Sequence, residues 1–245
     1  MTPLRVFIGV DSRQPVAFNI SQASIWRHAS VPVAITPLVL QTLPVQRTGL
    51  TEFSVSRYLV PWLCGYEGHA LFIDGDTLCM DDIADLPWDS EYAVSVVHHD
   101  TVVKNGKEVD VRFERPSVML FNNAKCTALT PEYVEHNKPH GLQWAQSVGE
   151  LPPEWNYLIG YDNRNHLKFR RGRSLDEVQI KLAHFTMGLP CFAECANDEY
   201  AQEWLETAAW AGHTCEWADI MGGSVHARWK QPPAVNQLMR LQGFG

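Results

Sequence analysis

The first forty residues constrain the fold more than any other part of this chain. An apolar run at 4–10, rich in β-branched residues, stops at Asp11 and is typical of a buried parallel strand. A helical pattern of apolar residues begins at Pro15, and a second apolar run follows at 31–40. Because parallel strands need a crossover between them, this β-α-β opening predicts an α/β sheet.

The rest of the chain continues the same alternation. A helix is predicted at 54–65, with Ser54 as its cap, a kink at Pro61 and its end at Gly65. No repeat or linker is visible, so a single domain over 1–212 is predicted, followed by a tail at 213–245 that packs on the domain or trails from it. The other predicted elements are strands at 69–74, 92–97, 117–122 and 178–185, helices at 130–137 and 198–212, and a hairpin turn at Asn105-Gly106.

Composition narrows the class of protein. The 245 residues carry 20 Lys and Arg against 28 Asp and Glu, a net charge of −8, which disfavours sequence-independent binding to nucleic acid. The six cysteines have no C-x-x-C spacing, which indicates buried, reduced thiols. The amino terminus runs directly into a strand, and no apolar run approaches the about 20 residues that span a bilayer. We therefore expect a cytoplasmic protein without a membrane span.

Carboxylates follow the predicted strand at 69–74. Asp74 and Asp76 are separated only by Gly75, and two like charges this close repel unless a positive charge lies between them. Ligands of α/β sheets bind beyond the carboxyl ends of strands, and His184 stands at another such end. We therefore predict a divalent cation held by Asp74, Asp76 and His184. The imidazole favours Mn²⁺ over Mg²⁺, and Gly75 leaves the backbone open to a bulky anion.

Four segments resemble a known family. The string "IDGDTLCMDDIADL" resembles the D-x-D segment of GT-A glycosyltransferases of the glycogenin and lipopolysaccharide-galactosyltransferase type. The segments "TEFSVSRYLVPWLCGYEGHALFIDGD", "SVMLFNNAKCTALTPEYV", "LPPEWNYLIGYD" and "HFTMGLPCF" are similar to bacterial and phage glycosyltransferases of this group. The resemblance implies a single GT-A-like domain with a mixed, mostly parallel sheet flanked by helices. It also implies sugar transfer with retention of configuration.

The resemblance also implies a donor site. The donor is a nucleotide sugar, with a UDP-sugar favoured, and its diphosphate meets the metal held by Asp74, Asp76 and His184. The resemblance further implies that the nucleoside lies against Val10, Asp11 and Ser12, and that Gly75 and Gly188 line the donor site. The lysine of the glycogenin-type ending is absent, since Leu189 stands before the final proline. Arg57, expected near a helix N-terminus, is predicted to supply the missing positive charge on the diphosphate.

The acceptor side is less defined. His99 and Asp100 follow a predicted strand, and Trp155 and Asn156 resemble an acceptor-side loop of the family. Ser117 ends Glu114-Arg115-Pro116-Ser117, which departs from the family's N-W-S-S or N-S-G. The acceptor is a glycan, a lipid-linked sugar or another hydroxyl compound; the net charge disfavours nucleic acid, although a modified DNA base stays open. Two alternatives also stay open: a sugar-nucleotide-binding protein without transferase activity, and a phosphatase of the haloacid-dehalogenase class.

Overall fold

The computed structural model describes residues 2–161, 172–174 and 177–212. The chain divides into a first unit, Met1–Ala211, and a second unit that begins at Gly212. The predicted tail at 213–245 lies outside the described residues. Among the described helices, none combines the length and the apolar character that crossing a lipid bilayer requires.

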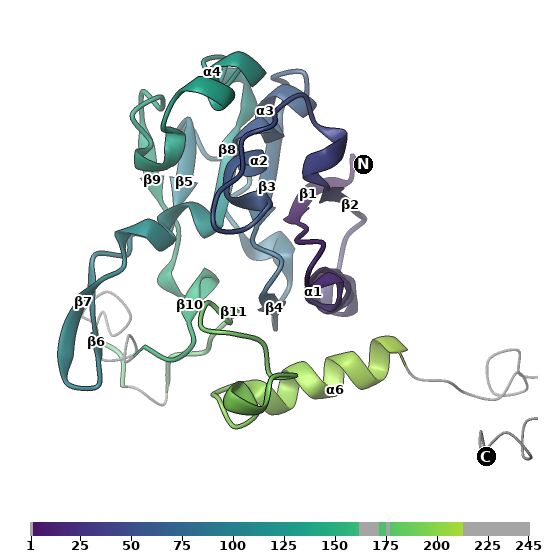
Figure 1. Ribbon diagram of the computed structural model, residues 1–245, viewed down its shortest axis with the longest axis vertical. Coiled ribbons are helices and arrows are strands. Elements are labelled where there is room, and N and C mark those ends of the chain that lie inside the picture. Colours follow the sequence, from purple (N-terminus) through teal and green to yellow (C-terminus); the bar gives the residue numbers. More distant parts are fainter. Residues whose placement is uncertain (1, 162–171, 175–176, 213–245) are drawn as a thin grey trace, which may run out of the picture. The chain divides into compact units, whose positions relative to one another are not determined.

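A six-stranded mixed sheet forms the centre of the first unit, in the order β2-β1-β3-β8-β5-β9 (Figure 1). The pairs β1–β2, β1–β3 and β5–β9 are parallel, whereas β8 runs antiparallel to both of its neighbours. This sheet confirms the predicted α/β class. The strands are β1 (Leu4–Gly9), β2 (Val33–Leu38), β3 (His69–Ile73), β5 (Val94–Val96), β8 (Val118–Asn122) and β9 (Val148–Glu150).

Successive side chains of a strand point to opposite faces of a sheet. In the central sheet both faces carry apolar side chains, and both are covered. One face buries Phe7, Phe72 and Phe121 against α2, α3 and α4. The other buries Ile8 and Leu71 together with residues of α1. The helices of this unit are α1 (Pro15–His28), α2 (Phe53–Ser56), α3 (Val60–Leu63), α4 (Pro131–His136) and α6 (Ala201–Gly212).

The predicted helix at 54–65 is broken into three short pieces. A 3₁₀ segment, Arg57–Leu59, separates α2 from α3. Ser54 lies inside α2, where its hydroxyl accepts a hydrogen bond from the backbone N–H of Thr51, so the prediction that it caps the helix is wrong. Arg57 is buried and is the first residue of the 3₁₀ segment between α2 and α3.

A second, three-stranded sheet follows the order β10-β11-β4. Its strands are β4 (Thr77–Cys79), β10 (Tyr157–Leu158) and β11 (Leu182–His184). Since only three residues separate the end of β3 from the start of β4, the Asp74-Gly75-Asp76 segment connects the two sheets. The predicted strand at 178–185 is present but confined to Leu182–His184, and β4, β9 and β10 were not predicted.

The predicted hairpin projects to one side of the molecule (Figure 1). Strands β6 (Thr101–Lys104) and β7 (Lys107–Asp110) pair antiparallel around Asn105 and Gly106. The φ angles of these two residues are 51° and 73°, as a type I′ turn requires, so the turn prediction is confirmed.

Candidate active site

The Asp74-Gly75-Asp76 segment is held rigidly at the junction of the two sheets. The backbone N–H of Asp74 donates to the carbonyl of Ser117 at 2.9 Å, and the Thr77 hydroxyl donates to the carbonyl of Asp74 at 2.8 Å. The carbonyl of Asp76 accepts from the N–H of Phe185 at 2.9 Å. These bonds fix the main chain from which both carboxylates project.

Gly75 is required by a close approach of two backbones. A Cβ atom at this position would lie 2.3 Å from the carbonyl oxygen of Gly9, at the end of β1. The contact brings the D-x-D segment against the residues that follow β1. The absence of a side chain at Gly75 is therefore explained by packing within the protein.

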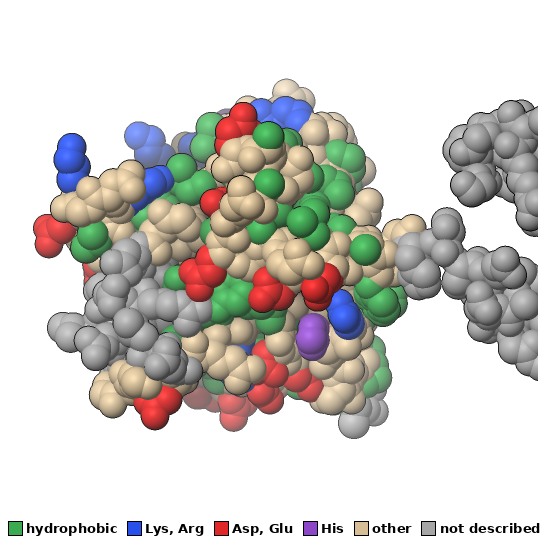
Figure 2. Space-filling model, turned by 90° about the horizontal axis from the view of Figure 1, so that it is seen from below, with side chains coloured by type: hydrophobic (Ala, Val, Ile, Leu, Met, Phe, Trp, Pro, Cys, Tyr) green, Lys and Arg blue, Asp and Glu red, His purple; other side chains and the backbone are tan. Residues whose placement is uncertain are grey.

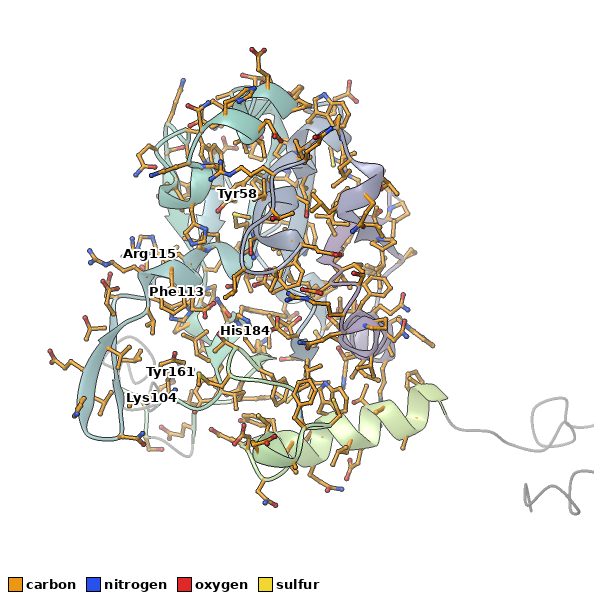
Figure 3. All side chains as sticks on the ribbon, in the orientation of Figure 1. Tyr58, Lys104, Phe113, Arg115, Tyr161 and His184 are labelled. Carbon is orange, nitrogen blue, oxygen red and sulfur yellow. The ribbon has the colours of Figure 1, made fainter. Side chains whose placement is uncertain are left out.

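His184 faces the two aspartates. Antiparallel pairing sets His184 of β11 opposite Thr77 of β4, next to Asp76. The Nε2 atom of His184 lies 3.4 Å from Oδ1 of Asp76 and 4.0 Å from Oδ2 of Asp74. Figure 3 shows His184 in the interior of the unit, and its side chain is only 2% exposed. The structure therefore brings together the three predicted metal ligands.

The tautomer of His184 is set by Asn156. The Nδ2 atom of Asn156 donates to the carbonyl of Glu114 at 3.2 Å, which orients the amide so that its Oδ1 lies 3.0 Å from Nδ1 of His184. Because an amide oxygen can only accept, Nδ1 of His184 must donate. In its deprotonated form, which is the form that binds a metal, the imidazole would present the lone pair of Nε2 toward Asp74 and Asp76.

Arg57 lies beside Asp74 and is buried with it. One guanidinium nitrogen is 3.0 Å from Oδ1 of Asp74, while the others donate to the carbonyls of Phe53 at 3.1 Å and Pro116 at 2.8 Å. Sequence reasoning predicted that Arg57 binds the donor diphosphate, and this stays a prediction. In the structure its guanidinium contacts Asp74 and two backbone carbonyls, and so orients Asp74.

The pKa values reflect an excess of negative charge. Burial raises the pKa of Asp74 to about 7; the charges of Asp76 and Glu114 add to this effect, and Arg57 and His184 oppose it. Burial alone would lower the pKa of His184, but the facing carboxylates, Asp76 foremost, raise it to about 9. The carboxylates of Asp74, Asp76 and Glu114 therefore favour a cation among them.

The same residues fit a divalent cation. Oδ1 of Asp76 is buried and accepts no hydrogen bond from any described residue. Ligand atoms of Asp74, Glu114 and His184 all lie within 4.8 Å of one another. Carboxylate oxygens and an imidazole nitrogen are ligands that suit Mn²⁺ and related ions.

Glu114 was not predicted as a site residue. It is buried, its carboxylate accepts hydrogen bonds from Ser117 and Thr186, and one of its oxygens lies 3.9 Å from Nδ1 of His184. The only signal in the sequence was the departure of Glu114-Arg115-Pro116-Ser117 from the family pattern. Nothing in that string indicates that its acid faces a histidine 70 residues later (184 − 114).

The predicted donor residues Val10, Asp11 and Ser12 directly follow Gly9, the last residue of β1. The carbonyl of Gly9 lies against Gly75 of the D-x-D segment. Asp11 accepts hydrogen bonds from Arg13, which lower the pKa of its carboxyl group. Both the N–H and the hydroxyl of Ser12 donate to Glu52, and the N–H of Val10 donates to Leu38. Gly188 ends the turn after β11 with a φ of 137°.

The predicted acceptor residues fall into two groups. Ser117 lies at the site, and its hydroxyl donates to Glu114 at 2.8 Å. The carbonyl of His99 and the carboxylate of Asp100 both bond Arg115, which holds their loop to the segment before β8. Trp155 and Asn156 are 2% and 0% exposed, and Ser117 and His99 are similarly buried at 1% and 4%, so of the five residues only Asp100 presents an exposed side chain in this structure.

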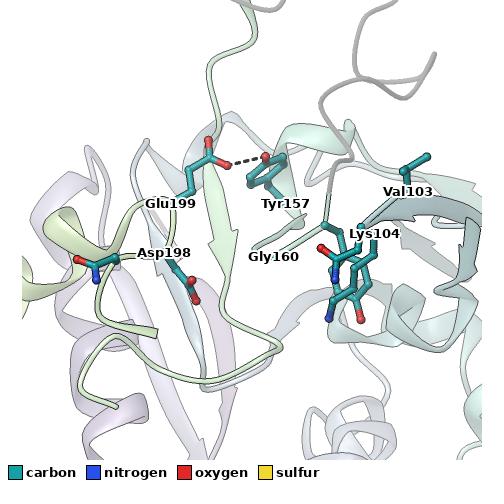
Figure 4. A pocket seen from close by; sticks show the side chains of 9 residues that line it. Val103, Lys104, Tyr157, Gly160, Asp198 and Glu199 are labelled. Atoms are coloured by element: carbon teal, nitrogen blue, oxygen red, sulfur yellow. Dashed lines mark hydrogen bonds between the residues drawn. The ribbon is translucent and has the colours of Figure 1, made fainter. Parts of the chain in front are cut away.

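A separate hollow of about 500 Å³ opens between the β6–β7 hairpin and the loop before α6 (Figure 4). Within it, the hydroxyl of Tyr157 donates to Glu199 at 2.7 Å, and the ammonium of Lys104 lies 4.7 Å from the centre of the Tyr161 ring. Its lining residues are Val103, Lys104, Asn105, Tyr157, Gly160, Tyr161, Asn197, Asp198 and Glu199.

Fold and site together define the chain as a protein of the GT-A glycosyltransferase fold. The galactosyltransferase LgtC, solved with donor and acceptor sugar analogues, superposes with a TM-score of 0.57 at 12% identity, over 88% of this chain and 99% of that one. The bifunctional glycosyltransferase WbbM gives 0.58 at 15%, over 85% of this chain and 50% of that one. GlyE of Streptococcus pneumoniae gives 0.56 at 14%, over 90% and 62%. This chain thus spans half of WbbM and less than two thirds of GlyE.

A sequence relative defines the family. No family model matches the chain. Protein CDI of Arabidopsis thaliana is 33% identical over 229 residues, which cover 83% of this chain and 85% of Protein CDI. The chain belongs to the same family as Protein CDI.

Proposed function

We propose that this protein transfers a sugar from a nucleotide-diphosphate sugar to a hydroxyl group, with the help of a divalent cation. One observation carries the proposal: Nε2 of His184 points at the carboxylates of Asp74 and Asp76, and a buried oxygen of Asp76 has no hydrogen-bond partner among the described residues. The GT-A fold, shared with LgtC and WbbM, gives this arrangement its context.

Asp74, Asp76 and His184 would hold the cation, and Mn²⁺ is favoured over Mg²⁺ because one ligand is an imidazole. When bound there, the cation would supply Lewis-acid stabilisation of the diphosphate leaving group. The protein contributes preorganisation, since Arg57 orients Asp74 and Asn156 orients His184. The ligands therefore need little rearrangement when the donor arrives.

The donor is a UDP-sugar, with its nucleoside against Val10, Asp11 and Ser12 and its diphosphate at Asp74-Gly75-Asp76. The contact between Gly75 and the carbonyl of Gly9 supports this arrangement, because it brings the two segments together. Gly188 lines the donor site from the turn after β11. Transfer proceeds with retention of configuration.

The acceptor is a glycan, a lipid-linked sugar or another hydroxyl compound. The proposed acceptor-side residues stay His99, Asp100, Ser117, Trp155 and Asn156. The hollow beside Tyr161 adds carboxylates, amides and aromatic rings, which are groups that bind sugar hydroxyls and sugar faces. Acidic side chains are spread over the face seen in Figure 2, and the net charge is −8. This charge disfavours nucleic acid as acceptor, with a modified DNA base as the remaining nucleic-acid candidate.

A cytoplasmic location accompanies this function. Cys64, Cys79, Cys126, Cys191 and Cys195 are free thiols among the described residues, as is typical of a reducing compartment.

The experiment that tests the function measures free UDP released from UDP-sugars in the presence of Mn²⁺. The wild type should release UDP, and Asp76→Asn should abolish release while the protein stays folded. Asp110→Asn, at an exposed ion pair on the hairpin, is the matched control and should behave as the wild type. Binding of UDP-sugar by the wild type without release of UDP would instead support a sugar-nucleotide-binding protein.

A further inference from the structure

Glu114 lies beside His184, near the Nδ1 atom, and one of its carboxylate oxygens lies within 4.8 Å of a ligand atom of Asp74. Its Oε2 is 3.9 Å from Nδ1 of His184 and accepts a hydrogen bond from the Ser117 hydroxyl at 2.8 Å. Its Oε1 accepts from the hydroxyl of Thr186, two residues after His184. The carboxylate therefore joins the segment before β8 to the turn that follows β11.

The main chain of the same residue acts on His184 by a second route. The carbonyl of Glu114 accepts from Nδ2 of Asn156, and Oδ1 of Asn156 accepts from Nδ1 of His184. Glu114 and Asn156 are both buried, so these bonds are shielded from water. Through Asn156, the main chain of Glu114 thus holds the imidazole in one orientation and one tautomer.

The charge of Glu114 has a consequence of its own. With Asp74 and Asp76 it makes three carboxylates around His184, whereas Arg57 is the one guanidinium in contact with them among the described residues. Both oxygens of Glu114 already accept hydrogen bonds, from Ser117 and Thr186, and the carboxylate lies nearest Nδ1, the nitrogen of His184 that does not face Asp76. A negative group near that nitrogen raises the basicity of the nitrogen that would bind the metal. It also increases the attraction of the site for a cation.

We propose that Glu114 is a positioning residue of the metal centre, which raises the affinity of Asp74, Asp76 and His184 for a divalent cation without binding it. This inference rests on the metal site of the proposed function. It goes beyond that function, because it assigns a role to a residue outside the predicted ligands. Loss of such an outer carboxylate generally weakens metal binding by about 10- to 100-fold.

The test compares the Mn²⁺ affinity of full-length variants, measured by calorimetry without nucleotide. Glu114→Gln keeps the size of the side chain and removes its charge, and it should weaken Mn²⁺ binding by about 10- to 100-fold. The matched control is Glu154→Gln. Glu154 is also a buried glutamate before a strand, but its carboxylate bonds Arg173 and not the metal cluster. The control should bind Mn²⁺ as the wild type does.

A second variant covers the case in which Glu114→Gln fails to fold. Thr186→Val removes the hydroxyl that donates to Glu114 but leaves every charge in place, and it should weaken Mn²⁺ binding by a smaller factor. Melting temperatures of the metal-free proteins separate loss of affinity from loss of fold.

The outcomes separate this inference from the function on which it rests. Wild-type affinity in a folded Glu114→Gln protein, or in Thr186→Val if Glu114→Gln does not fold, overturns the role of Glu114. If Asp76→Asn has lost Mn²⁺ binding in the same series, the metal site itself stands. If the wild type binds no Mn²⁺, both the site and the inference fail.

Discussion

The guanidinium of Arg57 lies 3.0 Å from the carboxylate of Asp74, and their side chains are only 5% and 8% exposed. A buried pair of this kind is costly to break, because the remaining charge is left without compensation. Arg57 also bonds the carbonyls of Phe53 and Pro116, so it connects α2 and the segment before β8 to the D-x-D segment. Its first effect is therefore on the stability of the site.

Arg57→Ala is expected to lower the free energy of unfolding by about 3–5 kcal/mol. The free energy of unfolding of Arg57→Lys should lie between those of the wild type and Arg57→Ala, since an ammonium group cannot reach all three partners of the guanidinium. Urea denaturation measures the effect. Arg112→Ala, at an exposed pair with Asp110, should leave the midpoint unchanged. An unchanged midpoint in Arg57→Ala would contradict this structural role and leave the guanidinium for its predicted role on the diphosphate.

Gly75→Ala should distort the metal site. The added Cβ would meet the carbonyl oxygen of Gly9 at 2.3 Å, and a strand backbone cannot move aside as a flexible side chain can. Overpacking of this kind costs about 1–3 kcal/mol of stability. Chemical denaturation should report a loss of stability, and Mn²⁺ titration should report a loss of affinity. Gly212→Ala, where a Cβ would meet nothing within 4 Å, is the control, and equal behaviour of the two variants would contradict the expectation.

Mn²⁺ should stabilise the folded protein. A ligand at 100 times its dissociation constant adds about 2.7 kcal/mol to the free energy of unfolding. For a protein of this size that corresponds to a rise in melting temperature of roughly 5–10 °C. Differential scanning calorimetry should give a larger rise with Mn²⁺ than with an equal concentration of Mg²⁺. A rise of the same size in Asp76→Asn would show that the ion binds elsewhere.

The product should keep the anomeric configuration of the donor sugar. The resemblance to the glycogenin type implies this outcome, and the observed GT-A fold is compatible with it. Proton NMR during transfer reports the configuration from the coupling of the anomeric proton in the first product formed. Appearance of the opposite anomer before any equilibration would reject the expectation.

Local patterns in the sequence determined most of the sheet and the position of the acidic segment. The apolar runs that became β1, β3 and β8 are bounded by polar residues, and α1 begins at a proline, so each element has its own signal. Asn105-Gly106 specified its turn because only a few residues accept positive φ angles. Asp74 and Asp76 stood out because like charges this close need a partner.

Only the tertiary structure decided which distant side chains meet. The pairing of β4 with β11 brings His184 beside Asp76, and β4, at three residues, is too short to have a periodic signal. Glu114 and Asn156 are linked across 42 residues, and no local pattern encodes that contact. Arg57 has the same neighbours in the sequence whether it faces water or Asp74. The break between α2 and α3, and burial against the rings of Phe53 and Phe72, decide that it faces Asp74. Long-range packing, which depends on the whole chain, therefore completes a site whose first ligands are visible in one short segment.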